Sequence, residues 1–382
     1  MGATSREPGQ EEILLSADSH VIELPDLWET RMPRIFRERA PRVYFDERRQ
    51  AWMFGCADVL PQAVGGLFMA GQRPEEIENF RKAGFSAARA GGWDPIQRLK
   101  DMEVDGVSGE VLYPSLGLGL FCVEDAALQE ACFQVYNDWI INYCKSAPEK
   151  LYGIGLISVF DIEHAISELE RCKKAGLRGA MIWQVPHRNL PFSSDHYDRF
   201  WAAAQDFDMP VNLHILTGHG PSMHRQTLTG IERYRRGVNQ TEEIANALFD
   251  IIFSGALERF PRLKLVSVEN EIGWIPYWLG QCDKAFARHR STARLTIDKP
   301  PSEYFQRQVY ATFFNDYIGC RMLSWWGVDN CMWSNDYPHQ NSTWPRSREV
   351  IARDLGALPA GDRKKLVRHN VTGLYNLTGF EH

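Results

Sequence analysis

Strand-like and helix-like segments alternate along this chain from residue 107 onward. Short apolar runs predict strands, and the longer amphipathic runs between them predict helices. Together with a run near the N-terminus, the predicted strands are residues 13–17, 107–113, 152–159, 179–183, 211–214, 264–269, 309–313 and 331–335. The predicted helices are residues 125–146, 161–175, 195–207, 242–260, 272–289 and 348–355. This alternation implies a parallel sheet and eight strands imply its closure, so we expect an α/β fold of the (β/α)8 TIM-barrel type.

Residues 21–92 interrupt the alternation with several prolines and glycines. Residues 42–45 and 51–54 could form a hairpin within this stretch. We expect a large insertion after the first strand, a lid region at the end of the barrel where loops determine specificity. The chain of 382 residues would then form a single barrel domain, residues 13–376, behind a polar N-terminal tail, residues 1–12.

Composition limits the partners that such a barrel can have. The formal net charge is -6 and no block of Lys and Arg offsets it, so a nucleic-acid partner is not expected. No stretch reaches about 18 consecutive apolar residues, and the polar start of the chain lacks the apolar core of a secretory signal. The eight cysteines form no Cys-x-x-Cys pair, which suits buried thiols in a reducing compartment. We therefore expect a cytoplasmic protein that acts on a small molecule and does not contact a membrane.

Four side chains with metal-binding chemistry stand at the ends of predicted strands. Asp18 and His20 end the first apolar run, and residues two apart on a strand point to the same face. His214 and Asp336 end two later runs. Because the carboxyl ends of barrel strands meet at one face, these four residues are predicted to bind one divalent ion. Two imidazoles and two carboxylates suit zinc, which is the first expectation, or manganese.

Each of these residues taken alone has a plainer explanation. A strand-end aspartate such as Asp18 often caps the following turn, and an isolated core histidine such as His214 often bonds to a backbone carbonyl. The coincidence of all four residues at strand ends favours metal binding. Without it, a non-catalytic barrel that serves as a binding scaffold would be the alternative.

Further acidic and histidine side chains are candidates for catalysis. Asp336 can take a proton from metal-bound water as a general base. Glu269 is predicted to continue its strand into the barrel mouth and to act as a second acid or base, whereas Glu271 could begin the next helix, where the dipole favours negative charge. His339 either lines the pocket or packs in a turn. Glu23, just after the first strand, is another candidate.

For three other residues, the sequence either leaves two roles open or indicates no role in the site. Tyr113 ends the second strand and is either a substrate contact or a core tyrosine. His219 and His224 lie in the irregular stretch after the fifth strand, where histidines exposed to solvent are expected.

Six segments together resemble the amidohydrolase superfamily, in the branch called amidohydrolase 2 that includes aminocarboxymuconate semialdehyde decarboxylase and related aromatic-acid decarboxylases. These segments are residues 18–23, 136–139, 176–179, 210–214, 272–276 and 335–339. The resemblance implies a metal-dependent (β/α)8 barrel with ligands at Asp18, His20, His214 and Asp336. It also implies a homodimer or a larger homo-oligomer.

One departure from this family bears on the reaction. Many of its decarboxylases have a histidine near the end of the sixth strand, where this chain has Glu269, Asn270 and Glu271. The leading hypothesis is therefore a hydrolase that attacks a small aromatic or cyclic substrate with metal-activated water. The alternative is nonoxidative decarboxylation of an aromatic or enoic acid, in which Asp336 protonates the carbon.

Overall fold

The eight predicted barrel strands form one parallel sheet in the computed structural model, which describes residues 12–56, 59–221, 229–292 and 295–380. The sheet order is β1-β5-β6-β7-β8-β9-β10-β11. The strands are β1 (Leu15–His20), β5 (Gly109–Tyr113), β6 (Leu151–Leu156), β7 (Gly179–Ile182), β8 (Val211–His214), β9 (Leu265–Val268), β10 (Val309–Phe313) and β11 (Cys331–Trp333). The prediction of a TIM barrel is confirmed.

Backbone hydrogen bonds join the two ends of this sheet. The amide of Asp336, just beyond β11, donates to the carbonyl of Asp18 in β1 at 3.1 Å. The amide of His20 donates to the carbonyl of Tyr337 at 2.6 Å. Closure leaves the barrel without a free edge, and it joins three of the predicted metal ligands through their own main chain.

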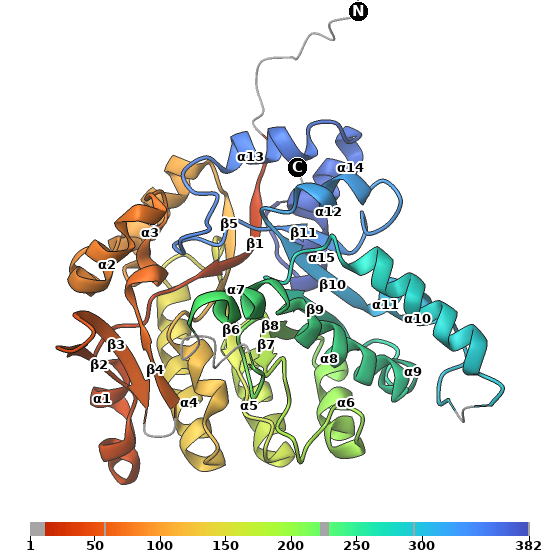
Figure 1. Cartoon of the computed structure of the whole chain (residues 1–382), viewed down its shortest axis with the longest axis horizontal. Coiled ribbons are helices and arrows are strands. Elements are labelled where there is room, and N and C mark those ends of the chain that lie inside the picture. Colours follow the sequence, from red (N-terminus) through yellow and green to blue (C-terminus); the bar gives the residue numbers. More distant parts are fainter. Residues whose placement is uncertain (1–11, 57–58, 222–228, 293–294, 381–382) are drawn as a thin grey trace, which may run out of the picture.

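Helices surround the strands, which occupy the centre of the view (Figure 1). Asp94, Asp125 and Asp161 each accept hydrogen bonds from first-turn amides, so aspartate caps fix where three helices begin. The helices between strands are α3 (Pro95–Asp105), α4 (Ala126–Cys144), α5 (Ile162–Lys174), α6 (Asp198–Asp206), α7 (Gly230–Val238), α8 (Thr241–Phe253), α9 (Ala256–Arg259), α10 (Ile275–His289), α11 (Pro301–Gln308) and α12 (Tyr317–Met322). Helices α13 (Ser347–Leu355), α14 (Ala360–Lys364) and α15 (Asn370–Tyr375) follow β11.

One predicted helix is divided. The helix expected over residues 242–260 is α8 followed by the short α9. Gly255 stands between them with a φ of 79°, a left-handed conformation that interrupts an α-helix and that glycine adopts without a steric penalty.

The stretch after β1 carries a second, smaller sheet. Strands β2 (Arg42–Asp46), β3 (Ala51–Cys56) and β4 (Val59–Ala63) pair antiparallel in that order. The predicted hairpin is β2–β3, and β4 was not predicted. This sheet lies at the left of Figure 1 together with α1 (Leu27–Arg31) and α2 (Ile77–Ala83). The amide of Ala70 in the same stretch donates to the carbonyl of Pro338, which ties it to the loop that follows β11.

The interior of the described chain is apolar and holds free thiols. Seven of the eight cysteines are buried and Cys122 is half-buried, and none of them is in a disulfide bond. No helix within the described ranges combines the length and the hydropathy that a bilayer crossing requires. The expected homo-oligomer and the domain boundaries stay predictions.

Candidate metal centre

The ends of four barrel strands bring six ligand-type side chains together. Their ligand atoms fall into two overlapping groups, within each of which all atoms lie within 4.8 Å of one another. β1 and β8 carry three of the six within the strands. Glu269 directly follows β9, and the other two lie in the segment after β11. The first group is Asp18, His20, His214 and Glu269, and the second is His20, Glu269, Asp336 and His339. All four predicted metal ligands thus meet at the carboxyl ends of the strands.

Both buried strand histidines present the same ring nitrogen to the centre. Nδ1 of His20 lies 2.7 Å from the carbonyl oxygen of Pro114, and Nδ1 of His214 lies 2.8 Å from that of Ile215. A carbonyl only accepts, so each Nδ1 carries the hydrogen and each Nε2 offers its lone pair. The two Nε2 atoms lie 3.3 Å apart. Two lone pairs facing each other at this distance call for a cation between them.

The buried carboxylates lead to the same conclusion. Neither oxygen of Asp18 has a hydrogen-bond partner in the described chain, although Oδ1 lies 3.4 Å from His20 Nε2. Leaving a buried carboxylate oxygen without a donor costs free energy that a bound cation would offset. Burial lowers the pKa of His20, but Asp18 and Glu269 outweigh it and raise that pKa well above its ordinary value, so these carboxylates attract positive charge at Nε2, which a bound cation would supply in place of a proton. The donor set therefore fits a divalent metal ion.

His339 lies in contact with both Asp336 and Ser115, although Oδ1 of Asp336 has no hydrogen-bond partner in the described chain. Nδ1 of His339 lies 2.9 Å from Oδ1 of Asp336, and Nε2 lies 2.9 Å from Oγ of Ser115. Burial and the carboxylate of Glu269 raise the pKa of Asp336 well above its ordinary value, whereas burial and His20 lower that of His339. His339 therefore belongs to the site and is not merely packed in a turn.

The backbone conformation that brings Glu269 to the centre differs from the predicted one. β9 ends at Val268, and Glu269 has a φ of 58°, so it does not continue the strand. Its Oε2 nevertheless lies 3.5 Å from His214 Nε2 and 3.7 Å from His20 Nε2. Asp336 is also left-handed, with a φ of 52°. Such conformations are uncommon outside glycine and gather at functional sites.

Glu271 does not begin the next helix, because α10 starts at Ile275. Its φ is 53° and its carboxylate accepts hydrogen bonds from the amides of Phe314 and Asn315, each at 3.3 Å. Burial, with help from the charge of Asp316, raises the pKa of Glu271 to about 7. Its carboxylate therefore links the turn after β9 to the turn after β10.

Glu23 supports the site without belonging to the cluster. Its buried carboxylate accepts hydrogen bonds from the amides of Ser115, Leu116 and Gly117 at 2.8–3.2 Å. Burial raises the pKa of Glu23 despite these donors. Glu23 thus fixes the loop after β5 that carries Ser115.

Tyr113 is a core residue. Its hydroxyl lies 2.8 Å from Oδ1 of Asn212 and 3.1 Å from the hydroxyl of Tyr375, inside the barrel. The expectation of an exposed His219 is wrong, because that ring is largely buried and lies 3.2 Å from Glu124. His224 lies outside the described residues.

Sequence reasoning did not find Ser115. It is a polar residue just beyond a predicted strand end, next to Pro114. A search for every polar residue at such positions would have included it, but nothing local indicates its contact with a histidine more than two hundred residues away.

Comparisons with known proteins agree with this geometry. The family model described as Amidohydrolase matches residues 88–377. A curated relative, gamma-resorcylate decarboxylase of Polaromonas sp. (strain JS666 / ATCC BAA-500), is 23% identical over 261 residues, which cover 61% of this chain and 75% of the relative.

Two solved structures share the fold. An amidohydrolase of Mycobacterium avium subsp. paratuberculosis K-10 has a TM-score of 0.77 at 17% identity, covering 96% of this chain and 100% of its own. A dihydroxybenzoic acid decarboxylase of Polaromonas sp. JS666, solved with bound manganese and the inhibitor 2-nitroresorcinol, has a TM-score of 0.65 at 18% identity, covering 96% and 98%. With its family model matched over most of its length, the chain belongs to the amidohydrolase family.

Proposed function

We propose that this enzyme is a metal-dependent nonoxidative decarboxylase of an aromatic carboxylic acid. The observation that carries the proposal is the buried cluster in which Asp18 has no hydrogen-bond donor and two Nε2 lone pairs face each other. Curated relatives named as decarboxylases favour this reaction over the hydrolysis that the missing sixth-strand histidine suggested.

We assign one divalent cation to Asp18, His20, His214 and Asp336, with Glu269 as a further oxygen donor. All five offer ligand atoms in the two overlapping groups at the barrel mouth. Manganese replaces zinc as the first choice, because the Polaromonas decarboxylase was solved with manganese and carboxylate-rich sites accept it. When bound, the cation would supply positive charge that holds the substrate carboxylate and the oxygen of an adjacent hydroxyl group on the ring.

The chain's own residues handle the proton. When the bond to the carboxylate breaks and CO2 leaves, its electron pair stays on the ring carbon, which takes one proton from Asp336. In the metal-free chain, burial and the carboxylate of Glu269 raise the pKa of Asp336. His339 lies 2.9 Å away and is held by Ser115, so it orients Asp336 and restores its proton.

The test is a screen of the manganese-loaded protein against hydroxybenzoates in water enriched in heavy oxygen. Decarboxylation releases CO2 and leaves a ring product without solvent oxygen. Hydrolysis of an amide or ester panel would instead place one solvent oxygen in the product. The His214→Ala variant is the matched negative control. Solvent oxygen in the product, with no CO2 from any acid, would refute the proposal.

A further inference from the structure

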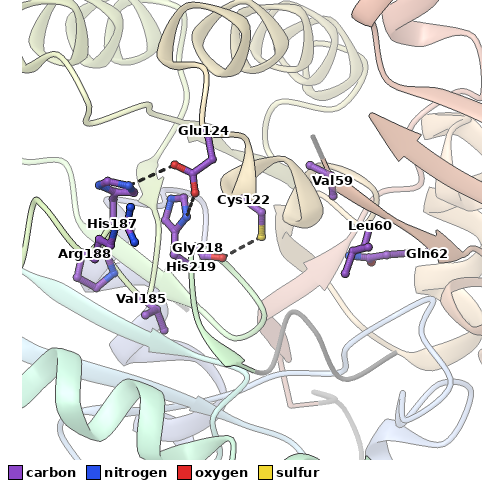
Figure 2. A pocket seen from close by; sticks show the side chains of 11 residues that line it. Val59, Leu60, Gln62, Cys122, Glu124, Val185, His187, Arg188, Gly218 and His219 are labelled. Carbon is purple, nitrogen blue, oxygen red and sulfur yellow. Dashed lines mark hydrogen bonds and ion pairs between the residues drawn. The ribbon is translucent and has the colours of Figure 1, made fainter. Parts of the chain in front are cut away.

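A second hollow lies at the same face of the barrel as the metal centre and shares none of its six side chains. Its volume is about 600 Å³, within the range of pockets that bind small organic molecules. Residues that follow β5, β7 and β8 line it on one side, and β4 of the insertion lines it on the other (Figure 2).

The β4 side of this pocket presents two apolar side chains next to the amide of Gln62 (Figure 2). Leu60 is 45% exposed there, and Val59 stands next to it. Val185, from the loop after β7, adds a third apolar side chain to the lining. Apolar surface left facing water in a concave site is typical of ligand contact.

The opposite side is polar, and its acidic group is already engaged. Glu124 lies between two imidazoles, with one oxygen 3.2 Å from His187 Nε2 and the other 3.2 Å from His219 Nδ1 (Figure 2). The two rings pack edge to face, with their centres 5.0 Å apart. This arrangement holds both histidines and the glutamate in place as a rigid wall.

Arg188 adds a positive charge that the described part of the chain does not balance. It lines the pocket next to His187 and is exposed, and within the described ranges it has no acidic or hydrogen-bonding partner. Because Glu124 is occupied by the two histidines, the guanidinium is free to bind an acidic group of a ligand.

One wall of the pocket lies a few residues along the chain from a predicted metal ligand, His214. Oγ1 of Thr217 donates to the carbonyl of His214 at 2.6 Å, and the next residue, Gly218, lines the pocket. Consecutive Cα atoms are about 3.8 Å apart, so this wall begins on the order of 10 Å from the His214 main chain.

We infer that this pocket binds the end of the substrate remote from the metal centre, and that this end is an apolar extension terminating in an acidic group. The inference rests on the proposed function. It defines the substrate as an extended aromatic diacid, longer than a simple hydroxybenzoate.

The experiment measures the activity of the manganese-loaded protein on 2-hydroxybenzoate and on a series of its derivatives. Each derivative carries one carboxyphenyl group, at a different open position of the ring. We expect at least one extended acid to have a KM about tenfold or more below that of the parent acid, because an added apolar contact in a pocket typically contributes this much. Leu60→Trp, which fills the pocket, and Arg188→Ala should each abolish this advantage and leave kcat/KM for the parent acid unchanged. Ile35→Trp and Arg288→Ala, on exposed surface elsewhere, are the matched controls.

A binding measurement separates this inference from the proposed function. Calorimetry with biphenyl-4,4′-dicarboxylate, which has an acidic group at each end, needs no turnover, and binding lost in Leu60→Trp and in Arg188→Ala would support the pocket even if no acid is decarboxylated. Equal KM values for all acids, together with equal binding of biphenyl-4,4′-dicarboxylate by wild type and both variants, would overturn the inference. Arg188→Ala changes an exposed side chain, so it keeps the test valid if Leu60→Trp does not fold.

Discussion

The amide of Asp336 donates a hydrogen bond to the carbonyl of Asp18 at 3.1 Å, so the segment that follows the last barrel strand is tied to the first strand. The side chains of the same two residues belong to the cluster of candidate metal ligands. Barrel closure and assembly of the centre are therefore one structural event. A chain that fails to close the barrel cannot form the site, and a cation bound there would hold the two ends of the sheet together.

This coupling predicts that metal binding stabilises the whole barrel. Removing the metal with a chelator should lower the melting temperature, because a ligand that binds only the folded state adds about 2.7 kcal/mol at about 100 times its Kd. His214→Ala should bind less than about one tenth of the wild-type metal and lose the chelator effect. Metal analysis and calorimetry measure both quantities.

His289→Ala, on the exposed end of α10, is the control for that experiment. It should keep wild-type metal content and the full response to chelator. An unchanged melting temperature for the chelated wild type would contradict the coupling.

Asp336→Asn should reduce decarboxylation by at least about 100-fold, since it removes a general acid. Asparagine keeps an oxygen in the place of Oδ1, so metal content should fall much less than in His214→Ala. Steady-state kinetics and metal analysis of the same preparations check this difference. Full activity in Asp336→Asn would rule out the proton role.

The left-handed backbone at Glu269 predicts an order of stabilities among its variants. Glu269→Gly should be more stable than Glu269→Ala by about 1 kcal/mol, because only glycine adopts a φ of 58° without strain. Both should lose activity, since each removes the carboxylate facing His20 and His214. Denaturant unfolding of the metal-free proteins measures the difference, and an alanine variant as stable as the glycine variant would show that the turn is unstrained.

The barrel was predictable from the alternation of strands and helices, and four of its site residues were predictable from the positions where the strands end. Asp18, His20, His214 and Asp336 stand where apolar runs stop, and parallel strands bring such positions to one face of a barrel. No long-range information was needed, since alternation of strands and helices specifies the order of the sheet.

The remaining site features depend on conformations and contacts that periodicity does not encode. Both Glu269 and Glu271 have a left-handed backbone, which is rare for glutamate. The apolar run therefore predicts that Glu269 continues the strand, and the helix dipole suggests a helix start for Glu271. Ser115 acts through a contact between distant segments. The pocket beside Glu124 requires β4, a short edge strand whose pattern is too weak to predict.

Glu271 predicts how stability changes with pH. Its pKa of about 7 in the folded chain lies above its ordinary value, so the unfolded chain releases the proton first as pH rises. The free energy of unfolding therefore decreases between about pH 4.5 and about pH 7, in total by on the order of 3 kcal/mol. Glu271→Gln keeps an oxygen for the amides of Phe314 and Asn315 but cannot ionise.

The Glu271→Gln variant should be more stable than wild type above pH 7, and the two should converge below about pH 4.5, where the carboxyl is protonated in both states. Urea unfolding of metal-free protein across this range measures the difference. Glu303→Gln, on the exposed face of α11, should follow the wild-type profile at every pH. A constant difference between Glu271→Gln and wild type from acid to alkaline pH would show that Glu271 has the same pKa in the folded and the unfolded chain, and would contradict the prediction.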